Sequence, residues 1–146
     1  MDDILGFRGR YKFLSNFFPV QINYEDITYP SVEHAYQASK TTNINERLLI
    51  SELPTAQKAK QYGQVIKLRE NWNDIKIDIM YELLKIKFQN TELKMQLIQT
   101  KDKYIEETNT WGDRFWGVCG TIGKNHLGQL LMKVRAELLW NQALGK

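Results

Sequence analysis

The sequence has little of several residue types on which whole protein classes depend. A single cysteine, Cys119, excludes an intramolecular disulfide framework and a zinc cluster built on thiolates. Two histidines, His34 and His126, leave little material for other metal sites, so we expect no metal and no cofactor. No apolar run approaches the roughly 18 residues that a membrane span requires. The acidic N-terminus also does not have the basic and then apolar order of a secretion signal, so we expect a cytoplasmic protein.

What the chain does contain is typical of one folded domain. Its 146 residues are enough for a single hydrophobic core, and we predict one domain over residues 1–146. Four Trp, seven Tyr and six Phe give more apolar surface than a disordered chain carries. The net charge of +3 permits phosphate-bearing ligands without requiring them.

Local patterns predict an α+β fold that is mostly helical, with a small antiparallel sheet. Residues 11–13 alternate as a short strand does, and the segments 20–24 and 27–29 flank turn residues as in a hairpin. Ser31 and Thr55 are suitable N-caps, and Asn71 or Asn73 opens what we expect to be the longest helix. The predicted helices cover about 31–40, 46–51, 55–63, a segment from 71 or 73, 91–99 and a last one from about 126. A strand is predicted at 104–107.

One helix face carries groups that could perform chemistry together. Glu33, then Tyr36 or Gln37, and then Lys40 are spaced so that they share one face of the helix. A carboxylate and an amine two turns apart can reach into one cleft. The same spacing is also that of an ordinary solvated helix face, because charged residues are mostly exposed.

A glycine-rich loop from Trp111 to Lys124 is the second dense region. Its glycines allow a ligand to approach the backbone, and the helix that follows offers N-terminal amides to an anion. The loop is not a P-loop, because Val118 stands where that motif requires glycine. Asn125 is either a ligand contact or simply the N-cap of the last helix.

Tryptophans outside the regular apolar stripes are the third clue. Trp72 and Trp116 could stack on a base, or they could close the core at the ends of helices and loops. Trp72 and Lys76 are one helical turn apart, so that a ring and a cation could share a site.

Several separated segments, taken in order, carry more information than any of these patterns alone. They are Phe13–Pro19, Tyr29–Lys40, Ala59–Gly63, Trp72–Lys76, Leu84–Asn90 and Trp116–Arg135. Over nearly the whole chain they resemble the NADAR, or YbiA-like, family. The resemblance implies an N-glycosidase that hydrolyses the bond between ribose and an exocyclic amine of a base.

Two substrate classes follow from the resemblance. One is ADP-ribose attached to guanine in nucleic acid, and we favour it because a stand-alone domain of this length can act on that adduct without a pathway partner. The other is the pair of ribosylamino-pyrimidine phosphates early in riboflavin synthesis. A different class of function is a binding module that recognises ADP-ribose or a phosphosugar without cleaving it, which would not need Glu33 and Lys40.

The implied chemistry assigns roles to particular residues. A lysine could exchange into the ring-opened form of a glycosylamine and hold the sugar as a Schiff base. Lys40 is the first candidate and Lys76 the second, with Glu33 and Asp113 transferring protons. A direct displacement that uses two carboxylates and no adduct is the alternative.

The resemblance also implies a set of substrate contacts. Trp72 and Trp116 would stack on the base or sugar, and Asn16 and Asn125 would hydrogen-bond the ribose or phosphate. Ser15, next to Asn16, would also contact the substrate. The phosphate would be received by the backbone at Gly117 and Gly123. The segment Val118-Cys119-Gly120 has no acidic residue where some relatives have one, which leaves acidic chemistry in this loop to Asp113.

Overall fold

The computed structural model describes residues 2–146 and divides into two compact units. The central unit is Asn16–Lys87, and the flanking unit combines the segment up to Ser15 with Phe88–Lys146. Each unit has helices and short strands, so the predicted mostly helical α+β fold is confirmed. One domain over residues 1–146 stays a prediction, and its first residue, Met1, lies outside the described residues.

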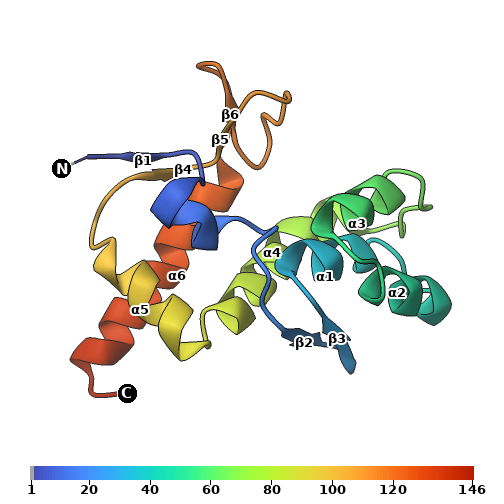
Figure 1. The fold of residues 1–146 in the computed structure, drawn as a ribbon, viewed down its shortest axis with the longest axis horizontal. Coiled ribbons are helices and arrows are strands. Elements are labelled where there is room, and N and C mark those ends of the chain that lie inside the picture. Colours follow the sequence, from blue (N-terminus) through green and yellow to red (C-terminus); the bar gives the residue numbers. More distant parts are fainter. Residues whose placement is uncertain (1) are drawn as a thin grey trace. The chain divides into compact units, whose positions relative to one another are not determined.

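The central unit begins with a hairpin and continues with four helices (Figure 1). Strands β2 (Ile22–Tyr24) and β3 (Ile27–Tyr29) pair antiparallel, and both turn residues, Glu25 and Asp26, have positive φ, as two-residue hairpin loops require. The helices are α1 (Val32–Ala38), α2 (Ile44–Ser51), α3 (Ala56–Gly63) and α4 (Trp72–Lys87). Helix α1 packs against the other three helices and is the centre of this unit.

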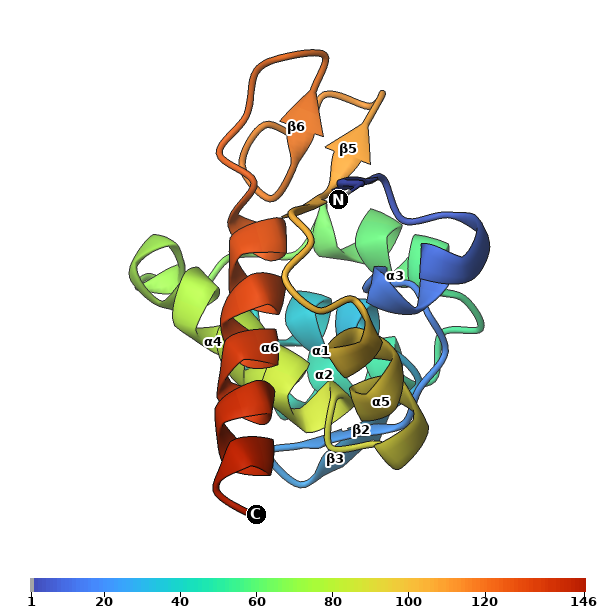
Figure 2. The same cartoon turned by 90° about the vertical axis from the view of Figure 1, so that its left-hand side faces the viewer.

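The flanking unit contains the remaining elements (Figure 2). They are β1 (Ile4–Leu5), the 3₁₀ helix η1 (Gly9–Leu14), α5 (Thr91–Gln99), β4 (Ile105–Glu106), β5 (Thr108–Asn109), β6 (Val118–Cys119) and α6 (His126–Ala143). Strand β1 pairs parallel with β4, and β5 pairs parallel with β6. Helix α6 packs on α5 and β4 around a core that contains Ile4, Leu97, Ile105 and Leu131.

Two local predictions were wrong. Residues 11–13 belong to η1 rather than to a strand, because Tyr11 N–H donates to Arg8 O and Ser15 N–H donates to Lys12 O. The consecutive residues Phe13 and Leu14 are both buried, which a strand with one buried face does not allow. The longest described helix is α6, with 18 residues, whereas α4 has 16.

Two kinds of feature are absent from the described residues. None of the helices within 2–146 is both long enough and apolar enough to cross a membrane. The same residues contain no group of three or more His, Cys, Asp or Glu side chains arranged to hold a metal ion.

Candidate active site

Helix α1 is short, well capped and entirely buried. The Ser31 hydroxyl accepts a hydrogen bond from the backbone N–H of His34, as the predicted N-cap requires. All seven residues of α1 are buried, including an acid and an amide. Buried groups of this kind require partners, because leaving them without hydrogen bonds costs free energy.

A partner of the Glu33 carboxylate lies one helical turn away. Gln37 Nε2 donates to Glu33 Oε2 at 2.6 Å, and the two side chains are only 4% and 8% exposed, respectively. The backbone N–H of Glu33 donates to Asn16 O at 3.0 Å. The carboxylate is therefore held in a fixed position in a site that is largely shielded from water.

Gln37 is itself held against the last residue of α3. A Cβ atom on Gly63 would lie 1.8 Å from Gln37 Oε1, so only glycine leaves room for this amide. Gln37 Oε1 is buried and accepts no hydrogen bond from the described residues. Gly63 is the last residue of α3, and its missing side chain also leaves space for the Gln37 amide. In that space Gln37 can point its Nε2 donor at Glu33.

Lys40 follows α1 and lies beside the same glycine. Its Nζ is 3.5 Å from Gly63 O and 5.7 Å from the ring centroid of Tyr36. Burial lowers the pKa of Lys40 from its usual value, the charge of Glu33 acts against this, and the charges of Lys76 and Lys60 add to the lowering. A lysine in such surroundings has a larger neutral, nucleophilic fraction near neutral pH than an ordinary exposed lysine.

The aromatic residues of this unit support α1. Trp72 is 4% exposed and packs on Tyr36 with ring centroids 5.2 Å apart. This arrangement matches the core-closing alternative for Trp72. Lys76, on the same helix as Trp72, donates through Nζ to Asn73 Oδ1 at 3.3 Å.

Asn16 and His34 complete the surroundings of α1. Asn16 Nδ2 contacts Met80 Sδ at 3.5 Å, while its buried Oδ1 has no donor among the described residues. His34 bridges Ser31 Oγ and Leu53 O through its two ring nitrogens, and these contacts fix its ring between α1 and the end of α2. Burial lowers the pKa of His34, and the hydrogen bond to Leu53 partly offsets this. We call Asn16, Glu33, Gln37, Lys40 and Gly63 the α1 cluster.

Sequence reasoning overlooked a second lysine with a low pKa. Burial lowers the pKa of Lys87 to about 7, and its side chain has no exposed surface. Its Nζ lies 5.8 Å from the ring centroid of Phe18. Without any exposed surface Lys87 is poorly placed to meet a substrate, whereas Lys40 is only partly buried.

The predicted site residues of the flanking unit are engaged with their own loop. Asp113 Oδ1 accepts hydrogen bonds from the backbone N–H groups of Phe115 and Trp116, at 3.1 and 2.9 Å. The partly buried Trp116 ring packs edge-on against Phe115, with centroids 4.9 Å apart. Ser15 is the C-cap of η1 and donates its backbone N–H to Lys12 O. These contacts hold the local chain conformation.

The two glycines predicted to receive a phosphate are also required by packing. A Cβ on Gly117 would lie 2.1 Å from Glu107 O, and one on Gly123 would lie 2.2 Å from Gly117 O. Asn125 has a left-handed backbone, with φ 53°, and its side chain forms no cap hydrogen bond. Instead its Nδ2 donates to Ile105 O at 2.9 Å, which ties α6 to β4. Asn125 is therefore the N-cap residue of α6, as one alternative predicted, but its side chain bonds the β4 segment instead of the first turn of the helix.

The structure thus places the predicted residues in two groups. Within the central unit it brings together Glu33 and Lys40, with Asn16, Trp72 and Lys76 on neighbouring elements. The loop residues of the flanking unit lie together around β5 and β6. Sequence reasoning did not identify the roles of Gln37 and Gly63, although the spacing of four residues between Glu33 and Gln37 was a usable signal.

A solved structure has the same fold as this chain. The NMR structure of the Escherichia coli protein YbiA superposes with a TM-score of 0.85 at 32% sequence identity. The match covers 97% of this chain and 88% of that one. The two proteins therefore share their fold.

Sequence comparison finds relatives of two kinds. An N-glycosidase of Nostoc punctiforme is 36% identical over 88% of this chain and 86% of its own length, and the N-glycosidase YbiA of E. coli is 35% identical over 88% and 82%. A riboflavin biosynthesis protein of Vibrio vulnificus is 38% identical over 86% of this chain. The matched region is only 35% of that relative's length, so the chain spans about a third of it.

The family comparison covers most of the sequence. The NADAR domain matches residues 6–139. Together with relatives named N-glycosidases, this match supports a glycosidase activity. The chain belongs to the NADAR family.

Proposed function

We propose that this protein is an N-glycosidase that releases a ribosyl group from the exocyclic amine of a base, with Lys40 as the nucleophile and Glu33 as the proton-transfer group. The observation that carries the proposal is the α1 cluster, in which a carboxylate on α1, fixed by Gln37, lies in electrostatic reach of a lysine of lowered pKa that follows this helix. A glycosylamine is chemically suited to these two groups.

The reaction can be written as an exchange of amines at C1′ of the ribose. The ring opens as the C1′–O4′ bond breaks, the N–H proton of the exocyclic amine passes through Glu33 to O4′, and C1′ is left in a neutral imine with the base nitrogen. Neutral Lys40 Nζ adds to C1′, and Glu33 transfers the two Nζ protons in turn to the base nitrogen. The bond between C1′ and that nitrogen breaks, the base leaves as a free amine, and a neutral lysine Schiff base remains. Water then adds to C1′, the C1′–Nζ bond breaks, Nζ recovers a proton, and the sugar is released.

The surroundings of the α1 cluster support these roles. Lys76 and Lys60 favour the neutral form of Lys40 through their charges. Glu33 and Gln37 are held before the substrate arrives, which reduces the reorganisation needed in the transition state. Asn16 Oδ1, a buried acceptor without a donor among residues 2–146, is suited to a ribose hydroxyl.

The substrate that we propose is ADP-ribose attached to guanine in nucleic acid. The alternative is a ribosylamino-pyrimidine phosphate, and it is favoured by the relatives of Vibrio vulnificus and Zea mays, which are named riboflavin biosynthesis proteins. Both substrates present the same ribosylated exocyclic amine to Lys40 and Glu33. They differ in the leaving group.

The test is to incubate the full chain with each substrate in parallel and to quantify the released sugar phosphate or ADP-ribose by mass spectrometry. We expect release from the ADP-ribosylated guanine oligonucleotide, and loss of release in Lys40→Ala. Lys58→Ala, on the exposed surface of α3, is the matched control, and we expect it to retain activity. Release from the ribosylamino-pyrimidine phosphate alone would show that this compound, and not ADP-ribosylated guanine, is the substrate. Binding of either compound without release of its sugar would show that the protein is a binding module and not an enzyme for these substrates.

A further inference from the structure

The flanking unit contains a cavity to which the proposed glycosidase chemistry assigns no role. It has a volume of about 270 Å³ and lies between η1 and the C-terminal part of α5. The lining polar side chains are Arg10, Tyr11, Gln96, Gln99, Thr100 and Lys103. None of the residues that line it is acidic, so its charge is positive.

Tyr11 holds both lining cations at this cavity. The Arg10 guanidinium carbon lies 4.9 Å from the centroid of the Tyr11 ring, a distance typical of a cation–π contact. Lys103 Nζ donates to Tyr11 Oη at 3.5 Å. Neither cation forms an ion pair with a described carboxylate, so both retain capacity for an anionic ligand.

A third cation reinforces the cavity from within the core. Arg135 Nη1 donates to Thr100 Oγ1 at 2.9 Å. Burial lowers the pKa of Arg135 and the charge of Asp102 acts against this, but an arginine stays protonated in proteins. Asp102 is the acid next to Lys103 in the sequence, and its charge acts on Arg135.

The end of α5 could oppose an anion, because the last carbonyls of a helix carry partial negative charge. At the end of α5, several of these carbonyls already accept backbone hydrogen bonds. The backbone N–H groups of Thr100, Lys101 and Lys103 donate to the carbonyls of Leu97, Ile98 and Thr100. The cationic side chains therefore determine the sign of the local field.

We propose that this cavity binds a phosphate group, carried by a nucleotide or by a nucleic-acid strand. Arg10 and Lys103 supply charge-assisted hydrogen bonds, and the amides of Gln96 and Gln99 supply neutral donors. A volume of about 270 Å³ is below the range of pockets that enclose drug-sized ligands, and it suits a phosphate with part of its sugar.

The first experiment observes binding directly, independently of any glycosidase activity. ¹⁵N-labelled full-length protein is titrated with inorganic phosphate, with AMP and with a short oligothymidylate. We expect the side-chain signals of Arg10, Gln96 and Gln99 to shift in a saturable way. Tighter binding of AMP than of the oligonucleotide identifies a mononucleotide site, and the reverse order identifies a site for a strand. The absence of shifts with all three probes overturns the proposal.

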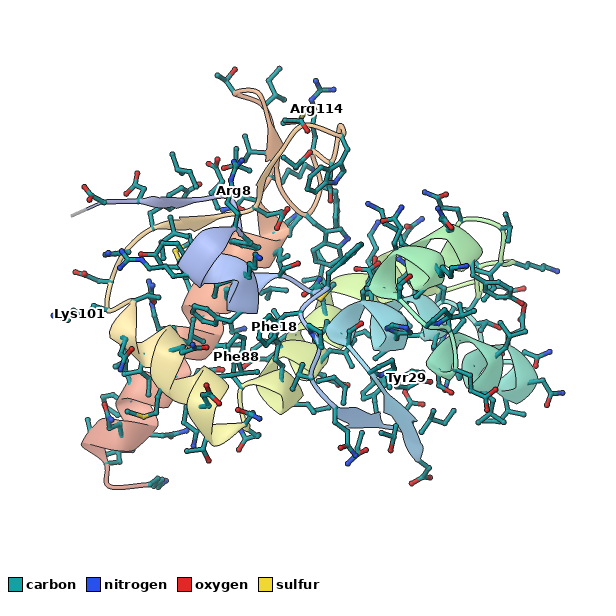
Figure 3. The ribbon with its side chains drawn as sticks, viewed as in Figure 1. Arg8, Phe18, Tyr29, Phe88, Lys101 and Arg114 are labelled. Carbon is teal, nitrogen blue, oxygen red and sulfur yellow. The ribbon has the colours of Figure 1, made fainter. Side chains whose placement is uncertain are left out.

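Substitutions then test the two cations. We expect Arg10→Gln and Lys103→Gln each to weaken binding of the best probe about tenfold. The matched controls are Lys12→Gln on η1 and Lys101→Gln, whose exposed side chain points away from the ribbon at the end of α5 (Figure 3). Controls that weaken binding as much as the cavity variants would show diffuse surface attraction and would contradict a defined site.

Discussion

The α1 cluster and the loop Trp111–Lys124 are equally rich in residues that suggest catalysis, but their polar groups have different roles. In the loop, Asp113 accepts two backbone hydrogen bonds, and Gly117 and Gly123 fit against backbone oxygens. In the α1 cluster, one side chain fixes another, and a lysine has a lowered pKa. A dense motif therefore identifies an important region, whereas the hydrogen-bond partners indicate which side chains can act on a substrate.

The largest expected effect is a loss of kcat/KM when the acid of the α1 cluster is neutralised, compared with neutralising the acid of the loop. Glu33→Gln keeps the shape of the side chain but removes proton transfer, and we expect kcat/KM to fall about 10²- to 10⁴-fold. Steady-state kinetics on the preferred substrate measure this fall. Asp113→Asn is the matched change in the loop, and it leaves Oδ1 able to accept the two backbone hydrogen bonds. We expect it to retain most activity, and a fall as large as that of Glu33→Gln would contradict the comparison by assigning proton transfer to Asp113.

The next effect contrasts two glycines. In Gly63→Ala the new Cβ displaces the flexible Gln37 amide, and we expect roughly a tenfold loss of kcat/KM with a stability cost of about 1–3 kcal/mol. In Gly117→Ala the Cβ meets the Glu107 carbonyl, which cannot move without the chain. We expect Gly117→Ala to lose more stability than Gly63→Ala. Thermal unfolding and kinetics of both proteins give the answer, and equal activity of Gly63→Ala and the wild type would refute the role of Gln37.

A smaller effect concerns stability of the loop. Asp113→Ala removes an acceptor of two backbone hydrogen bonds on a partly exposed side chain, and we expect a loss of about 1 kcal/mol. Urea unfolding measures it, with Asp113→Asn as the control that keeps the acceptor. If the two variants are equally stable, the carboxylate oxygen does not hold this turn.

The smallest effect is a shift along the pH axis. Because the pKa of Lys40 is lowered, its neutral fraction rises with pH at values below those of an ordinary lysine, and kcat/KM should rise in the same range. Lys76→Met removes a charge that lowers this pKa, so the rising limb should move to higher pH. Glu33→Gln should move the residual limb to lower pH, because the charge of Glu33 raises this pKa. A limb that stays fixed in both variants would show that another group titrates.

Local features of the fold could be predicted because their causes are close in sequence. Ser31 and Thr55 cap their helices as expected, and the hairpin turn needs only its two central residues. The parallel pairs β1–β4 and β5–β6 could not be predicted, because each strand has two residues and β1 pairs with a segment about 100 positions away. Such short strands carry no periodic pattern.

The candidate site likewise has features that the sequence could predict and features that it could not. The spacing of Glu33 and Lys40 placed both on one helical face, and the structure keeps them in electrostatic reach of each other. The fit between Gln37 and Gly63 depends on how α3 packs on α1, which no local pattern contains. The position of Asn125 as N-cap of α6 could be predicted, but the partners of its side chain, Ile105 and Glu107, lie about 20 positions away and could not.

The most direct test of the account is to find the residue that carries the sugar during turnover. The full chain is mixed with ADP-ribosylated guanine oligonucleotide and borohydride, and the reduced adduct is located by peptide mass spectrometry in the wild type and in Lys40→Ala. We expect one adduct, on Lys40, that is absent from the variant. An adduct on Lys76 or Lys87, or release of ADP-ribose with no adduct at all, would contradict Lys40 as the nucleophile.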